Sequence, residues 1–92
     1  MEQIPQITRV RTTGLPHVRA SRATPRKEGL FLVTNVGSYL IPWAECSPSL
    51  AVAKQYERIR MRLLPAGIGI HWPLIDEDLA VGPLVDGRVP ST

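Results

Sequence analysis

Hydrophobic side chains fill nearly every position of two short runs, residues 30–34 and 39–43. Both runs are rich in β-branched, aromatic and aliphatic residues, and Asn35 and Gly37 between them can take the positive φ of a tight turn. The pattern therefore predicts a β-hairpin over 30–43. Both faces of each strand are apolar, which is unusual for a sheet with one wet face and indicates that both faces are covered.

Beyond this hairpin, the spacing of the hydrophobic residues first fits a helix and then changes to the alternation of a strand. Ser47, as N-cap, and Pro48 are typical of a helix start and predict one main helix over 48–57. In residues 58–63 charged and apolar side chains alternate without exception, which predicts a strand with one wet face. The chain then turns and returns as a strand over 68–72.

The apolar positions of this second hairpin restrict its register, because they must share one face. The simplest register that achieves this pairs Leu63 with Ile68, Met61 with Ile70 and Ile59 with Trp72. Trp72 is then a buried anchor of the core.

Three adjacent carboxylates follow Trp72 and Pro73, and an apolar segment follows them. Acidic side chains favour a helix N-terminus, so the segment predicts a short C-terminal helix. We expect Asp76 to cap backbone amides after the Trp72-Pro73 turn and Asp78 to cap that helix, with Glu77 solvated. The elements together predict an α+β fold, a small antiparallel sheet of two hairpins with one main helix packed on it.

The positive charge of the chain lies at its N-terminal end. The net charge is +3, and residues 1–28 hold six basic side chains against two acidic ones. Proline and few large apolar residues in this stretch predict a basic, mobile N-terminal segment. We expect a single α+β domain over 29–87 and a frayed tail over 88–92.

The single cysteine, Cys46, excludes an internal disulfide framework and is too few for a zinc knuckle. No stretch resembles a signal peptide, and no apolar run approaches the ~18 residues that a membrane span needs. A soluble cytoplasmic protein that does not enter a membrane is therefore expected.

Catalytic chemistry has few candidates in this chain. A metal ion would use Asp76, Asp78 and His71, but no phosphate loop, nucleophile elbow or Cys–His pair accompanies them. We therefore expect a protein that is not an enzyme and has no catalytic residue, metal, cofactor or small-molecule substrate.

Two kinds of partner remain open. The apolar sheet residues offer more surface than one ten-residue helix covers, so they predict a protein-interaction surface for a partner or for a homodimer. Its expected members are Phe31, Val33, Tyr39, Ile41 and Trp43.

The alternative partner is nucleic acid. Arg58, Arg60 and Arg62 would form a row on the outer face of the second hairpin, with His71 beside them. Alternate strand positions stand ~6.6 Å apart, which is close to the phosphate spacing along a nucleic-acid strand. The basic N-terminal segment would add to this contact.

Residues 29–87 resemble the bacterial domain-of-unknown-function family 2442. The resemblance depends on a short hairpin, on Ile41-Pro42-Trp43, on a proline-led helix with Ala53, and above all on Gly67-Ile68-Gly69-Ile70-His71-Trp72-Pro73-Leu74-Ile75-Asp76-Glu77-Asp78-Leu79. The chain differs from the usual family pattern in residues 1–28 and at Ala80, where family members often have a serine. The resemblance implies an antitoxin-like or regulatory protein.

Overall fold

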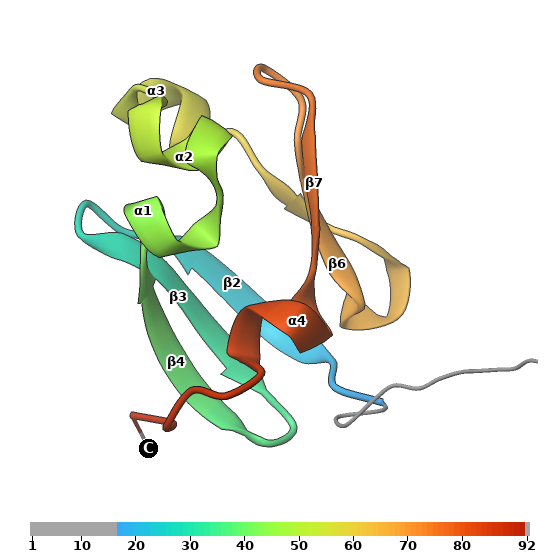
Figure 1. Ribbon diagram of the computed structural model, residues 1–92. Coiled ribbons are helices and arrows are strands. Elements are labelled where there is room, and N and C mark those ends of the chain that lie inside the picture. Colours follow the sequence, from blue (N-terminus) through green and yellow to red (C-terminus); the bar gives the residue numbers. More distant parts are fainter. Residues whose placement is uncertain (1–16, 92) are drawn as a thin grey trace, which may run out of the picture.

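Two three-stranded antiparallel sheets, with short helices along one side, form the frame of the protein (Figure 1). The computed structural model describes residues 17–91. The α+β fold class is confirmed, but the prediction of one sheet is wrong, because each predicted hairpin gains a third strand and forms a sheet of its own. Between residues 17 and 91 no helix is long and apolar enough to cross a bilayer.

The elements follow one another as sheet, helices, sheet and helix. The first sheet contains β2 (Ala20–Pro25), β3 (Gly29–Thr34) and β4 (Gly37–Pro42), and the second contains β5 (Arg62–Leu63), β6 (Gly69–Trp72) and β7 (Glu77–Ala80). The helices are α1 (Trp43–Cys46), α2 (Pro48–Val52), α3 (Gln55–Arg58), the 3-10 turn η2 (Pro65–Gly67) and α4 (Val81–Val85).

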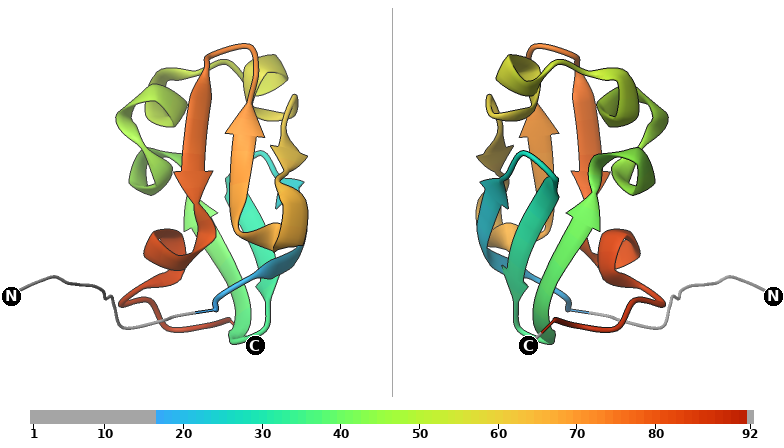
Figure 2. Two further views of the ribbon diagram at one scale, coloured as in Figure 1. Left: turned by 90° about the vertical axis from the view of Figure 1, so that its right-hand side faces the viewer. Right: turned by 90° about the vertical axis from the view of Figure 1, so that its left-hand side faces the viewer.

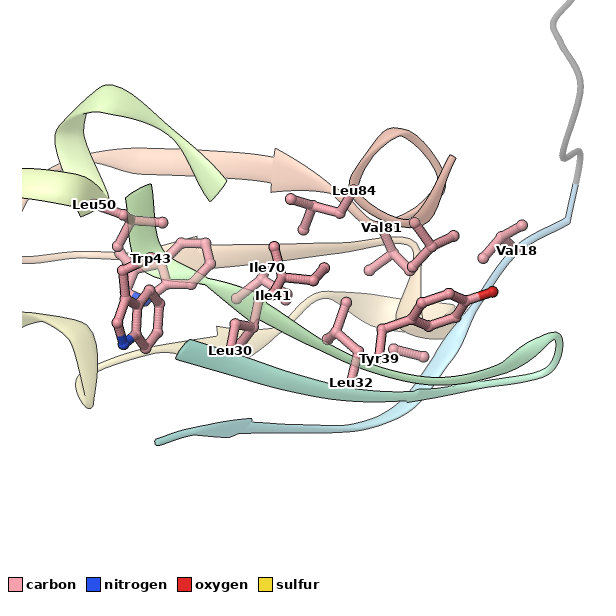
Figure 3. Packing of buried hydrophobic residues seen from close by; sticks show 13 residues of the cluster. Val18, Leu30, Leu32, Tyr39, Ile41, Trp43, Leu50, Ile70, Val81 and Leu84 are labelled. Atoms are coloured by element: carbon pink, nitrogen blue, oxygen red, sulfur yellow. The ribbon is translucent and has the colours of Figure 1, made fainter. Parts of the chain in front are cut away.

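One hydrophobic core lies between the two sheets (Figure 3). The first hairpin forms as predicted, and its register pairs Leu30 with Ile41 and Leu32 with Tyr39. Directly paired residues share a face, so these four side chains point together into the core. Ile70 of the second sheet meets them there.

The predicted helix over 48–57 is broken. Ser47 is the N-cap as predicted, since its hydroxyl oxygen accepts a hydrogen bond from the Leu50 amide at 3.1 Å. Ala53 and Lys54 are extended, with ψ of 152° and 155°, and they separate α2 from α3. In addition, the predicted first strand pair ends one residue early, because Trp43 already belongs to α1.

The second hairpin forms, but its register and length differ from the prediction. The chain pairs Arg62 with His71 and Leu63 with Ile70, a shift of two residues that keeps the faces unchanged. Residues 58–61 do not pair with β6, because Arg58 still belongs to α3. Trp72 is fully buried as predicted, whereas Ile59 and Ile68, both expected in the core, are more than half exposed.

The acidic segment is a strand rather than the start of a helix. A turn over 73–76, with Asp76 at a φ of 50°, leads into β7, and α4 begins only at Val81. The N-cap of α4 is Ala80, and no side chain caps it, so the predicted helix cap from Asp78 is wrong. Leu79 and Val81 continue the core instead.

Both ends of the domain are more ordered than predicted. The last third of the basic segment, residues 20–28, forms β2 and its turn to β3. The domain therefore includes residues 17–28, and residues 1–16 lie outside the described part. The C-terminal tail is also held, since the Ser91 amide donates to the Ser38 carbonyl and the Arg88 guanidinium bonds to Leu84 and Glu45.

Candidate interaction surface

The structure divides the predicted apolar surface into a buried part and an open part. Tyr39, Ile41 and Trp43 belong to the core, and the second sheet and the helices of the same chain cover them. Their assignment to an exposed partner surface is therefore wrong. Phe31 and Val33 point the other way, because they alternate with Leu30 and Leu32 along β3.

The open part is the outer face of the first sheet. The register places Phe31 between Thr24 and Leu40, and Val33 between Arg22 and Ser38. Figure 2 shows this sheet in front in its right-hand view, with no helix of the described residues lying across it. Phe31 and Val33 are half-buried and Leu40 is 39% exposed.

Two arginines flank the apolar centre of this face. Arg22 is exposed beside Val33, and the Arg26 guanidinium carbon lies 4.1 Å from the centroid of the Phe31 ring. A guanidinium above an aromatic ring is attracted by the negative face of the ring. No residue of β2, β3 or β4 is acidic, and the turn between β2 and β3 holds two basic residues and one acidic residue, Glu28. The outer face of the first sheet is therefore apolar at its centre, with more basic than acidic residues at its rim.

The predicted arginine row does not form. The Arg58 guanidinium donates to the carbonyls of Leu50 and Ala51 at 3.0 and 3.1 Å, and its carbon lies 5.2 Å from the Trp43 ring centroid. Arg58 therefore caps the C-terminal end of α2, and its guanidinium does not face a ligand. Arg60 and Arg62 are exposed, but only Arg62 lies on a strand, directly opposite His71.

Arg58→Lys is expected to lower the free energy of unfolding by about 1–3 kcal/mol. A lysine has one ammonium group in place of a planar fork, so it cannot serve both carbonyls with the same geometry. Arg60→Lys is the matched control, and as an exposed change it should stay within about 0.5 kcal/mol of the parent. Urea unfolding followed by circular dichroism compares the two, and equal losses would mean that Arg58 is not structural.

His71 and Asp78 are brought together by the second sheet. They are paired across β6 and β7, and the His71 Nδ1 lies 2.6 Å from a carboxylate oxygen of Asp78. Arg62 occupies the next position in the same cross-strand row. Within residues 17–91 no group of three or more His, Cys, Asp or Glu side chains is placed to hold a metal ion.

A pocket that the sequence did not indicate lies between α1, β7 and α4. Its volume is ≈ 430 Å³, and Cys46, Leu79, Pro83 and Leu84 are among its lining residues. Burial raises the pKa of the Cys46 thiol to about 11, and this effect outweighs the nearby Arg88. Cys46 is therefore a protonated, unreactive thiol at neutral pH, and its sulfur lies 3.7 Å from the Ile41 carbonyl oxygen.

Sequence reasoning missed Leu40 and the two arginines of the first sheet. Leu40 could have been found, since it lies on the opposite side of the strand from Tyr39 and Ile41. The arginines could not, because the sequence pattern predicts a mobile segment where the structure has β2. The pocket joins three segments that are distant in the sequence, and no local pattern indicates it.

A solved structure shares this fold. The crystal structure of a protein of unknown function from Rhodospirillum rubrum ATCC 11170 matches with a TM-score of 0.66 and 22% sequence identity, over 82% of this chain and 93% of that chain. At this identity the likeness shows the fold alone. No protein-family model matches the chain, and a search of the curated proteins also finds no match.

Proposed function

We propose that this chain is a non-enzymatic protein-interaction module of the antitoxin-like or regulatory kind. Its binding surface is the outer face of the first sheet, and its partner is another protein or a second copy of the chain. Membership of family 2442 is part of this proposal and depends on the block around Trp72.

One observation carries the proposal. A sheet that packs one face on the core normally presents polar residues on the other face. Here the outward positions include Phe31 and Val33 on the central strand β3 and Leu40 beside Phe31 on β4. An apolar centre with a polar rim is the arrangement of a protein interface, in which arginine and aromatic residues are enriched.

The nucleic-acid alternative has less support. Arg58, one of the three arginines expected to make it, is engaged with α2. Arg60, Arg62, His71 and the basic N-terminal segment remain as candidate contacts to nucleic acid. However, the Asp78 carboxylate lies against His71 on the same face and would repel phosphate.

Leu40→Lys tests the proposed surface. At micromolar concentration the parent chain is expected to sediment as a dimer or as a complex with a co-purifying protein. A charge at the centre of the interface should weaken this association by about tenfold or more, because central apolar contacts dominate binding energy. Sedimentation equilibrium with the tagged, purified chain provides the measurement.

Val52→Lys is the matched control for this experiment. Val52 is 85% exposed and lies on α2, away from the outer face of the first sheet, so its change should leave association unchanged. A monomeric parent chain that carries no partner would contradict the proposal. Tight binding of a labelled single-stranded DNA, lost in an Arg60→Gln, Arg62→Gln double variant, would favour the alternative.

A further inference from the structure

The sheets of residues 17–91 have four edges, and three of these edges are protected against strand addition. The β2 edge has a register irregularity between Ala20 and Arg22 and contacts η2, and β5 spans two residues and contacts β2. At the β4 edge, the Ser91 amide donates a hydrogen bond to the Ser38 carbonyl, and Pro42 has no amide proton. Bulges, short strands and prolines are the usual means by which proteins block strand pairing.

The fourth edge, β7, has none of these three devices. The Val81 amide donates to the Ile68 carbonyl, which makes 68 and 81 a hydrogen-bonded pair of the β6–β7 ladder. Bonded and non-bonded pairs alternate in an antiparallel ladder, so Glu77 and Leu79 also bond to β6. The N–H and C=O groups of Asp78 and the N–H group of Ala80 therefore point away from β6, and no further strand of the described residues pairs with them. The Ala80 carbonyl is already engaged, because Ala80 is the N-cap of α4 and its carbonyl accepts the first hydrogen bond of that helix.

Charge along this edge selects the partner. The Asp78 side chain is 65% exposed although it contacts His71, and Asp76 in the preceding turn is exposed. Two copies of β7 would bring these carboxylates together, and like charges across a strand pair are destabilising. An added segment with basic side chains would instead gain a favourable cross-strand contact.

The pocket adds a second feature on the inner side of the same edge. Leu79 and Ala80 of β7 line it together with Pro83 and Leu84 of α4. Figure 1 shows α1 and α4 on that side of β7. Asp78 lies on the opposite face of the second sheet, beside its cross-strand partner His71. A segment along the edge would thus meet carboxylates on one face. On the other face it would meet a pocket whose lining joins apolar residues of β7 and α4 with the charged side chains of Glu45, Asp86 and Arg88.

We propose that the β7 edge binds an extended peptide segment in which basic and apolar residues alternate, as an antiparallel fourth strand of the second sheet. The backbone of the segment bonds to the N–H and C=O groups of Asp78 and to the N–H group of Ala80. Its basic side chains lie beside Asp78, and an apolar side chain enters the pocket between α1 and α4. This site is separate from the outer face of the first sheet and does not depend on the function proposed for it.

The test uses a fluorescein-labelled hexapeptide of alternating lysine and valine, titrated with the 92-residue chain and followed by fluorescence anisotropy. Ala80→Pro removes an outward amide proton, and the φ of −81° at Ala80 suits proline, so the fold should be kept. This variant is expected to bind about tenfold more weakly or worse, while Ala80→Ser, which keeps the amide, binds like the parent. Melting temperatures verify that both variants are folded.

Two further peptides keep the proposal falsifiable if Ala80→Pro does not fold. A glutamate–valine hexapeptide should bind at least about tenfold more weakly, and so should the lysine peptide methylated at the backbone nitrogens of its lysines. Equal binding of the methylated peptide would show that charge alone attracts it and would overturn the proposal, as would equal binding of the acidic peptide or no binding of the lysine peptide. Leu40→Lys should not change the lysine-peptide affinity, which separates this site from the proposed interaction face.

Discussion

Trp72→Ala is expected to lower the free energy of unfolding by about 3–5 kcal/mol, the range for truncating a large buried aromatic side chain. Trp72 is fully buried, and its ring meets the Trp43 ring edge-on with the centroids 6.4 Å apart. Its indole N–H also donates to the Arg58 carbonyl at 3.0 Å. The variant therefore loses packing between the second sheet and the helices, and it leaves a carbonyl without its partner.

Leu74→Ala is the control for this prediction. Leu74 lies two residues further along the chain and is half exposed, so its truncation should change the unfolding free energy by about 0.5 kcal/mol or less. Guanidinium unfolding of the two variants and the parent gives the comparison. An unchanged midpoint for Trp72→Ala would mean that the indole is not an anchor of the core.

Local turn chemistry explains what the sequence predicted correctly. Gly37 takes the predicted positive φ, 135°, at the end of the first turn, whereas the prediction of a positive φ at Asn35 is wrong. Asn35 instead fixes the turn through its side chain, which is hydrogen-bonded to the backbone of Arg19 and His17. Ser47 begins a helix because its hydroxyl reaches the Leu50 amide. Such signals act within a few residues and can be recognised without knowledge of the rest of the fold.

The errors arise where distant contacts override a local pattern. Residues 58–63 alternate like a strand, yet Arg58 bonds to carbonyls of α2, and the Lys54 amide donates to the Glu57 carboxylate at the start of α3. These contacts hold Arg58 in a helix and shorten the strand to Arg62 and Leu63. The alternation predicts which side chains share a face, but not how many residues pair.

The candidate surface shows the same limit. Periodicity correctly separates Phe31 and Val33 from Leu30 and Leu32 as opposite faces of β3. It does not reveal which face the second sheet covers, because that depends on how β6 and β7 pack across the core. Periodicity alone therefore assigns Tyr39, Ile41 and Trp43 to a partner, although the chain itself covers them.

Gly67→Ala is expected to lower the free energy of unfolding by about 2–5 kcal/mol, from backbone strain and a steric clash together. Gly67 has a φ of +69°, and a Cβ atom there would lie 2.1 Å from the Ala20 carbonyl oxygen. Since that oxygen belongs to β2, relief of the clash requires η2 to move away from the first sheet. The substitution should thus loosen the contact that joins the two sheets at this edge.

Gly87→Ala separates the two contributions. Gly87 has a φ of +77°, but nothing lies within 4 Å of the position that a Cβ atom would take. Gly87→Ala should therefore lower the free energy of unfolding only by the cost of backbone strain, about 1–2 kcal/mol. Urea unfolding of both variants should show a clearly larger loss for Gly67→Ala, and hydrogen exchange should be faster at β2 and β5 in that variant alone. Equal losses at the two positions would mean that η2 does not fix the sheets to each other, and the close approach of Gly67 to Ala20 would then have no energetic role.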